Sequence, residues 1–362
     1  MCRIPRKGVS GGRLLAMLMA RGLMDSGNIV EVWSNNVNRD LSNDPLLAPV
    51  TIRLMLPAWL GKSKVIDSLI LLIAKGRRLF SDKKKNLFDV SIIVPEAGQP
   101  TLHKYMYLQC KAHSSRVVLL NFETPNWFNE LAPIPRPVAQ WDGWNYIAQE
   151  CGHVLSISNE SMRFAKDFYP SDTRHEVFYP IVTSTVGRNP LPWNDRDRSV
   201  LMITRYDPHK GVDGIVKILS QLESETIFRL VVGSTQLPKY IRLQIEEACR
   251  AGGIELEYYS TISAAQKSTL LETTKYLLFP SFFEGLGMPP IEALAAGMGV
   301  VAFDLPVLRE ISEEMYFVDP GDFITLGVKV AELLRDGGKQ KPSVPRRFML
   351  EESANNWSQI LG

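Results

Sequence analysis

Short apolar runs alternate with longer amphipathic stretches along most of the chain. The short runs are rich in β-branched and aliphatic residues, as buried strands are, and the longer stretches repeat apolar positions at helical spacing. In the first half, the predicted strands are IVEVWS (29–34), DVSIIVP (89–95), RVVLLNF (116–122) and HVLSIS (153–158). Strands separated by helices in this way predict a parallel α/β sheet.

The same alternation begins again after a stretch rich in proline, asparagine and aspartate that ends near residue 199. The predicted strands here are VLMIT (200–204), FRLVVG (228–233), IELEYYS (254–260), YLLFPS (276–281), VVAF (300–303) and MYFV (315–318). A helix over 263–273 is predicted to open with a capping box, in which Ser263 and Gln266 bind each other's backbone N–H groups. We therefore predict two doubly wound, Rossmann-like domains, residues 1–180 and 181–340, that face a central cleft.

Composition excludes several classes of protein. The chain is 45% hydrophobic and 22% charged with a net charge of +2, which is typical of a soluble globular protein and not of a nucleic-acid binder. The 4 cysteines and 5 histidines are scattered without metal-ligand spacing, so we predict neither a metal nor another cofactor. The longest apolar run, LILLIA (69–74), is too short to span a bilayer, and we predict a cytoplasmic location.

Charge is distributed unevenly between the two predicted domains. Residues 1–180 hold 22 Lys and Arg against 16 Asp and Glu, whereas the rest of the chain holds 19 against 23. The N-terminal domain is therefore expected to meet an anionic partner. Segment 64–86 adds an apolar helical stripe followed by a run of lysine and arginine. This segment is either a surface that contacts an anionic membrane or a core helix followed by a solvated turn.

Two cations follow the first strand of the second domain. In TRYDPHKG (204–211), Arg205 and Lys210 are expected at the carboxyl end of that strand, over the cleft. Cations held by a turn suit a diphosphate, which is best compensated from two sides. Exposed loop cations are the alternative interpretation, and the spacing alone leaves both open.

Two carboxylates flank a glycine turn in SFFEGLGMPPIEALAAG (281–297). A pair of prolines fits the first turn of a helix that starts near Met288, so Glu284 is predicted in the turn and Glu292 in the first helical turn. Backbone N–H groups of Gly285, Leu286 and Gly287 would then form a phosphate cradle. The alternatives are a solvated turn for Glu284 and a carboxylate stabilised by the helix dipole for Glu292.

These two motifs resemble a known family of enzymes. RYDPHKG (205–211) and EGLGMPPIEALAAG (284–297) are similar to the signature of the GT4 glycosyltransferases, which are retaining enzymes of the GT-B fold with an E-x7-E element. Weaker similarity extends to GVSGGRLLAMLMARGL (8–23) and to ISNESMRFAKDF (157–168). The C-terminal segment 341–362 resembles the family's closing helix, which crosses back to the N-terminal domain.

The resemblance implies a role for each matching residue. Arg205 and Lys210 would neutralise the donor diphosphate, Glu284 would contact the sugar, and Glu292 would bind the ribose. Gly11 and Gly12 would let the N-terminal loop approach the donor phosphates or the acceptor. The implied substrates are a GDP- or UDP-linked sugar, bound by the C-terminal domain, and a glycan or lipid-linked acceptor, bound by the N-terminal domain. Surface polysaccharide or lipopolysaccharide synthesis is the expected context.

One position departs from the family pattern. Many members carry a histidine near the sugar, after a central N-terminal strand, where this chain reads LLNFETPNWF (119–128). Asn121 and Glu123 are the acceptor-side candidates at this place, and Glu123 is equally compatible with a structural ion pair. An NAD-dependent oxidoreductase is disfavoured because GVSGGR does not fit G-x-G-x-x-G. A non-transferase GT-B relative, such as an epimerase or phosphorylase, and an inactive sugar-nucleotide-binding subunit remain alternatives.

Overall fold

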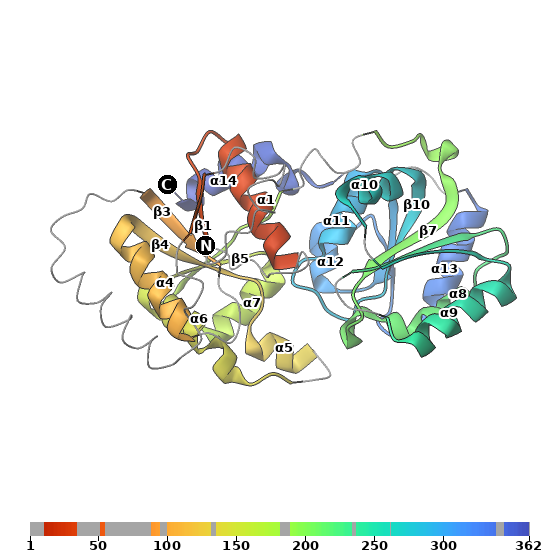
Figure 1. The fold of residues 1–362 in the computed structure, drawn as a ribbon, viewed down its shortest axis with the longest axis horizontal. Coiled ribbons are helices and arrows are strands. Elements are labelled where there is room, and N and C mark those ends of the chain that lie inside the picture. Colours follow the sequence, from red (N-terminus) through yellow and green to blue (C-terminus); the bar gives the residue numbers. More distant parts are fainter. Residues whose placement is uncertain are drawn as a thin grey trace. The chain divides into compact units, whose positions relative to one another are not determined.

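The computed structural model describes residues 11–34, 51–54, 88–94, 100–131, 135–181, 189–233, 237–260, 262–337 and 344–361. The chain divides into two compact units, with the main boundaries at Ile181/Val182 and Met349/Leu350. Unit 1 combines the N-terminal part with the last helix, and unit 2 is the segment between the boundaries (Figure 1). The segment at 64–86, predicted as a membrane surface or a core helix, lies outside the described residues.

Unit 1 contains two parallel sheets in its described part. Strands β1 (Glu31–Ser34) and β2 (Thr51–Leu54) form one sheet, and β3 (Phe88–Ile93), β4 (Ser114–Asn121), β5 (His153–Ser156) and β6 (Arg174–Val177) form the other in the order β3-β4-β5-β6. The helices are α1 (Gly11–Asp25), α4 (Pro100–His113), α5 (Pro125–Leu131), α6 (Asp142–Cys151), α7 (Asn159–Phe168) and α14 (Leu350–Leu361). Apolar side chains of α4, α6 and α7 pack against β3, β4 and β5 to form one core.

Unit 2 is built on one six-stranded parallel sheet with the order β12-β11-β10-β7-β8-β9. Its strands are β7 (Asp197–Thr204), β8 (Ile227–Val232), β9 (Glu255–Tyr259), β10 (Thr274–Phe279), β11 (Gly299–Phe303) and β12 (Tyr316–Val318). Helices α8 (Ile215–Leu219), α9 (Lys239–Gly252) and α13 (Phe323–Arg335) bury their apolar faces on one side of the sheet. Helices α10 (Ala264–Thr273), α11 (Met288–Ala295) and α12 (Pro306–Ile311) lie on the other side (Figure 1).

The predicted two-domain parallel α/β fold is confirmed. The strands predicted from apolar runs are present, with ends shifted by a few residues, and the Ser263–Gln266 capping box forms with N···O distances of 2.9 and 3.2 Å. Two strands escaped prediction, β2 and β6. The sequence of β6 is RHEV, whose polar side chains give no apolar run because the strand lies at the edge of the sheet.

The C-terminal helix α14 belongs to unit 1. Trp357 stacks on Phe178 with ring centroids 4.9 Å apart, and its indole Nε1 donates to the carbonyl of Tyr179 at 3.3 Å. Arg116 on β4 donates to the carbonyl of Ile360 at 2.8 Å. The predicted domain limits were 180/181 and 340/341, compared with Ile181/Val182 and Met349/Leu350 in the structure.

Candidate functional site

Strand order brings the two motifs of unit 2 together. Strands β7 and β10 are neighbours near the centre of a parallel sheet, so the loops that follow them leave the same edge side by side. The loop after β7 begins at Arg205, and the loop after β10 leads through Glu284 into α11. Residues 74 positions apart in the chain, Lys210 and Glu284, therefore become direct neighbours.

Backbone and ring contacts fix the two loops against each other. Phe282 N–H donates to the carbonyl of His209 at 2.8 Å, and the rings of His209 and Phe283 stack 4.3 Å apart. Gly211 ends the 3₁₀ turn Pro208–Lys210 in the left-handed conformation, with φ of +67°. A Cβ at this position would lie 2.2 Å from the carbonyl oxygen of Pro280, so the close approach of the loops requires glycine here.

Lys210 and Glu284 form an ion pair between the two motifs. Lys210 Nζ lies 2.5 Å from Glu284 Oε1, and the two side chains are 14% and 12% exposed. Such low exposure weakens solvent screening, so each charge strongly influences the position of the other. This pair places a cation and a carboxylate together at the carboxyl edge of the sheet, in a position to meet the charged and hydroxyl groups of one ligand.

Glu292 lies on α11 and has a different partner. The helix begins at Met288, as predicted, but Glu292 is its fifth residue and not part of its first turn. The prediction of a first-turn carboxylate is therefore wrong, because Pro289 and Pro290 occupy the helix start. Lys267 Nζ on α10 lies 2.7 Å from Glu292 Oε1 and 2.6 Å from Oε2.

Sequence reasoning missed Lys267 as a site residue. Its pairing depends on how α10 and α11 pack side by side, which no motif in the chain records. The sequence gives one indication of this residue: Lys267 comes directly after the capping box and is the one lysine of α10 (AAQKSTLLET). Tyr206 was also missed, although it lies inside the quoted motif.

Tyr206 anchors the basic loop to the elements around it. A hydrogen bond with Tyr240 is the main cause that raises the pKa of Tyr206 to about 12, and burial and the nearby Asp213 carboxylate add to it. The Tyr206 hydroxyl lies 3.4 Å from Asp213 Oδ1. The hydroxyl donates a hydrogen bond to that carboxylate.

Arg205 differs from Lys210 in its environment. Its guanidinium lies 3.1 Å from Asp207 Oδ2 within the same loop, and its side chain is 48% exposed. A surface pair of this kind contributes little to stability, so the side chain is free to reorient towards an anionic ligand.

The glycine turn before α11 is well packed. Leu286 is 3% exposed, and Gly287 adopts φ of +98° as the residue before the helix. Pro289 and Pro290 carry no N–H, so the backbone donors of this helix start are confined to Gly285, Leu286, Gly287 and Met288. The phosphate cradle stays a prediction, and its N–H groups would come from the turn more than from the helix end.

Four predicted site residues lie in unit 1. Gly11 and Gly12, predicted to bring an N-terminal loop to the donor phosphates or the acceptor, are the first residues of α1. Asn121 and Glu123 are the acceptor-side candidates. Asn121 ends β4, is fully buried, and accepts a hydrogen bond from the Tyr169 hydroxyl at 3.1 Å. Glu123 lies 3.4 Å from the guanidinium of Arg136, in agreement with the structural ion-pair interpretation. Asn121 therefore supports the strand end through Tyr169, and its acceptor-side role stays a prediction.

Two further observations bear on the predicted cofactors and location. Within the ranges that the structure describes, no group of three or more histidine, cysteine, aspartate or glutamate side chains is placed to hold a metal ion. None of the helices in those ranges is both long and apolar enough to cross a membrane. Metal independence and contact of segment 64–86 with a membrane stay predictions.

Comparison with known proteins agrees with the two-domain fold and with the motifs of unit 2. The two Rossmann-like domains define the GT-B architecture, and the structure of Anabaena HepE in complex with UDP and glucose shares this fold, with a TM-score of 0.71 and 15% identity over 99% of this chain and 97% of that one. Residues 185–351 match the family described as glycosyl transferases group 1. The matched segment is unit 2 almost in full and contains both motifs.

Two curated relatives with low sequence identity to this chain are named as mannosyltransferases. The O-antigen chain mannosyltransferase RfbU of Salmonella typhimurium is 23% identical over 180 residues, which cover 48% of each chain. The O-antigen chain mannosyltransferase B of Escherichia coli is 26% identical over 141 residues, which cover 38% of this chain and 36% of the relative. The chain thus aligns with about half or less of the length of these relatives.

Proposed function

We propose that this protein is a retaining, GT4-like glycosyltransferase that moves a hexosyl or deoxyhexosyl group from a nucleoside-diphosphate sugar to a glycan or lipid-linked acceptor. The observation that carries the proposal is the Lys210–Glu284 pair, which joins the two motifs at the carboxyl edge of unit 2 within the segment matching glycosyl transferases group 1. The mannosyltransferase names of the relatives favour a mannosyl donor, and their O-antigen context favours surface polysaccharide synthesis.

The chemistry follows from the charges of the site. Breaking the bond between sugar and phosphate builds negative charge on the leaving diphosphate, and fixed cations and N–H dipoles stabilise that charge. Arg205 and Lys210 supply the cations, and the turn at Gly285–Gly287 supplies N–H groups. Glu284 accepts hydrogen bonds from sugar hydroxyls, and Glu292 accepts them from the ribose. The acceptor hydroxyl attacks on the face from which the diphosphate leaves, and a phosphate oxygen takes its proton. No metal is needed for this charge balance.

The proposal is tested with a panel of nucleotide sugars that includes GDP-mannose, UDP-glucose and UDP-galactose. Release of nucleoside diphosphate in the presence of a lipid-linked glycan acceptor is expected from one donor and is expected to fall steeply in E284Q. NMR of the product should show the anomeric configuration of the donor. Inversion would rule out the retaining mechanism, and release of no nucleotide from any donor, with chemically intact wild-type protein, would rule out the transferase assignment.

A further inference from the structure

Lys267 pairs with Glu292 but has no role of its own in the proposed reaction. The Glu292 side chain is 4% exposed, whereas that of Lys267 is 25% exposed. Lys267 Nζ lies within 2.7 Å of Oε1 and 2.6 Å of Oε2, so one ammonium group contacts both oxygens of the carboxylate. The pair spans two helices that reach the sheet separately, α10 and α11.

Burial makes the partner of Glu292 essential to its charge. Moving a carboxylate out of water is costly unless an opposite charge and hydrogen bonds compensate for it. In the described part of unit 2, Lys267 supplies that compensation at the shortest distance. Contact with both oxygens also restricts rotation of the carboxylate, since turning it would lengthen at least one of the contacts.

The pair retains capacity for a ligand. A carboxylate offers about four acceptor positions. Lys267 donates a hydrogen bond to Oε1, whereas the buried Oε2 lies close to the ammonium group but has no hydrogen-bond partner. Each oxygen can therefore accept one further hydrogen bond without losing Lys267. The 2′- and 3′-hydroxyls of a ribose are a matching pair of donors, because they stand on adjacent carbons.

We propose that Lys267 is a positioning residue for nucleotide binding, an inference that rests on the proposed function. It fixes the orientation of Glu292 and compensates its charge, so that the two carboxylate oxygens accept the 2′- and 3′-hydroxyls of the donor nucleotide. Lys267 acts through Glu292 and does not neutralise the diphosphate, which is the role of the loop after β7.

Isothermal titration of GDP, UDP and their 2′-deoxy forms separates these roles. The proteins are the wild type, K267M, K267R, E292Q, the double variant K267M/E292Q and the control K329M. Lys329 also forms a lysine–glutamate pair, with Glu332 at 2.9 Å, but that pair lies on α13 and its side chains are 39% and 46% exposed. Urea unfolding checks each variant, and K267Q, which also removes the positive charge, replaces K267M if K267M does not fold.

The wild type is expected to bind its ribonucleotide about tenfold more tightly than the 2′-deoxy form, as loss of a hydrogen bond to a charged group predicts. In K267M this ratio should fall towards one, in K267R it should be partly restored, and K329M should match the wild type. K267M/E292Q should bind no more weakly than E292Q alone, because Lys267 acts through that carboxylate.

Different results would contradict the positioning role of Lys267 and the proposed function. A wild-type ratio in K267M, or losses in the single variants that add in the double variant, would overturn the positioning role while leaving the proposed function intact. Failure of folded wild-type protein to bind either GDP or UDP would overturn the proposed function and this inference with it.

Discussion

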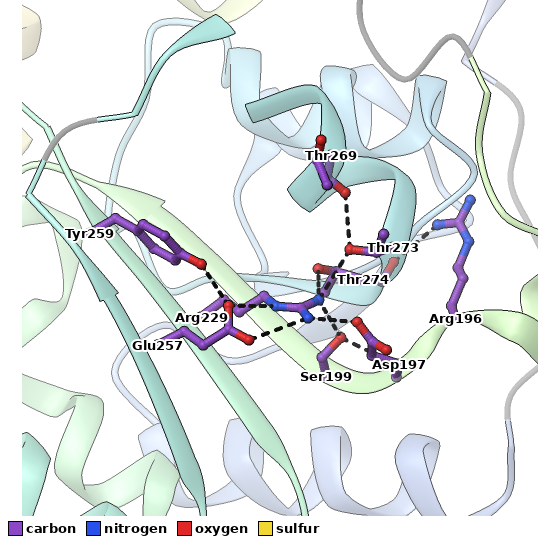
Figure 2. A network of polar contacts seen from close by, with 9 residues as sticks. All are labelled: Arg196, Asp197, Ser199, Arg229, Glu257, Tyr259, Thr269, Thr273 and Thr274. Carbon is purple, nitrogen blue, oxygen red and sulfur yellow. Dashed lines mark hydrogen bonds and ion pairs between the residues drawn. The ribbon is translucent and has the colours of Figure 1, made fainter. Parts of the chain in front are cut away.

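Unit 2 holds buried charge at both ends of one sheet, and the two ends differ in how the charge is bound. Near the amino ends of the strands, the guanidinium of Arg229 on β8 is surrounded by side chains from β7, β9, β10 and the end of α10 (Figure 2). Its partners are Asp197 at 2.6 Å, Ser199 at 3.2 Å, Glu257 at 3.1 Å, Thr273 at 3.3 Å and Thr274 at 2.9 Å. Near the carboxyl ends, Lys210 and Lys267 each pair with one glutamate.

The number of partners distinguishes a structural cluster from a candidate binding site. Burial alone lowers the pKa of Arg229, but its bonds to Asp197 and Glu257 outweigh that effect and raise the pKa. All three guanidinium nitrogens donate to side chains of unit 2, so little capacity remains for a ligand. Lysine ammonium groups with one carboxylate each keep donors in reserve. We infer that the charged side chains at the amino edge stabilise the sheet. Those at the carboxyl edge keep hydrogen-bonding capacity for a ligand.

The largest effect on activity is expected from K210M. It removes the cation that, in the proposed function, faces the leaving diphosphate, and loss of one such charge-stabilising group typically lowers kcat by about 10²–10³-fold. Stability should fall as well, because K210M leaves the 12%-exposed Glu284 carboxylate without its cation, but the activity per folded molecule should fall much further. Steady-state kinetics together with urea unfolding measures both quantities. If the loss of stability accounted for the whole loss of activity, Lys210 would be a structural residue like Arg229, and the two edges would not differ in function.

R229M should show the opposite pattern. It leaves Asp197 and Glu257 without their shared cation, and we expect a loss of about 3 kcal/mol in the free energy of unfolding. The turnover per folded molecule should stay close to the wild type. The matched control is R242M, which breaks the exposed Arg242–Glu246 pair on α9 and should cost under about 1 kcal/mol. Equal losses in both variants would show that the Arg229 cluster is not structural.

E284Q and E292Q separate the two glutamates of the candidate site. In the proposed function Glu284 contacts the reacting sugar, so E284Q should lower kcat by about 10- to 100-fold. The proposed partner of Glu292 is the ribose, so E292Q should chiefly raise KM for the donor, by about tenfold. Donor-saturation kinetics with equal protein concentrations measures both. If E292Q lowered kcat and E284Q raised KM alone, the assignment would have to be reversed.

G211A tests whether the two loops must touch. The new Cβ would meet the Pro280 carbonyl oxygen at 2.2 Å in a backbone with φ of +67°, so we expect about 2 kcal/mol of destabilisation and a parallel loss of activity. Gly27 also has positive φ, +87°, but a Cβ added there would meet no described atom within 4 Å. G27A should therefore cost about 1 kcal/mol from backbone strain alone and leave kcat unchanged.

The smallest effect is expected for an ion pair at the carboxyl edge that has no ligand role. Arg309 contacts both oxygens of Asp304 at 2.6 and 2.7 Å, and this contact lowers the pKa of the Asp304 carboxyl. A depressed pKa adds stability above the unfolded-state value, near pH 4, that is lost as pH falls through the folded-state value. D304N should remove this dependence at a cost under about 1 kcal/mol at pH 7, because the pair is partly exposed. Unfolding curves between pH 2 and 7 measure the difference, and kcat should not change.

The sequence predicted the elements of unit 2 because each of its strands is a short apolar run between amphipathic helices. It also placed Lys210 at the carboxyl end of one strand and Glu284 in the turn that follows another, and parallel strands bring such ends to one edge. It could not predict the partners of Glu292 and Arg229. Those contacts join elements that are distant in the chain, and they depend on which strands and helices are neighbours, an order that local patterns do not encode.

The return of α14 to unit 1 has a consequence for the order of folding. Trp357 packs on Phe178, so the two places where the chain crosses between the units are held next to each other in unit 1. Residues 182–349 must be made before the ribosome reaches this helix. Translation proceeds at about 5–20 residues per second, so synthesis of this segment takes roughly 10–30 s. During that time Phe178 is not yet covered by Trp357. During translation, the second unit therefore has time to fold before the first unit is complete.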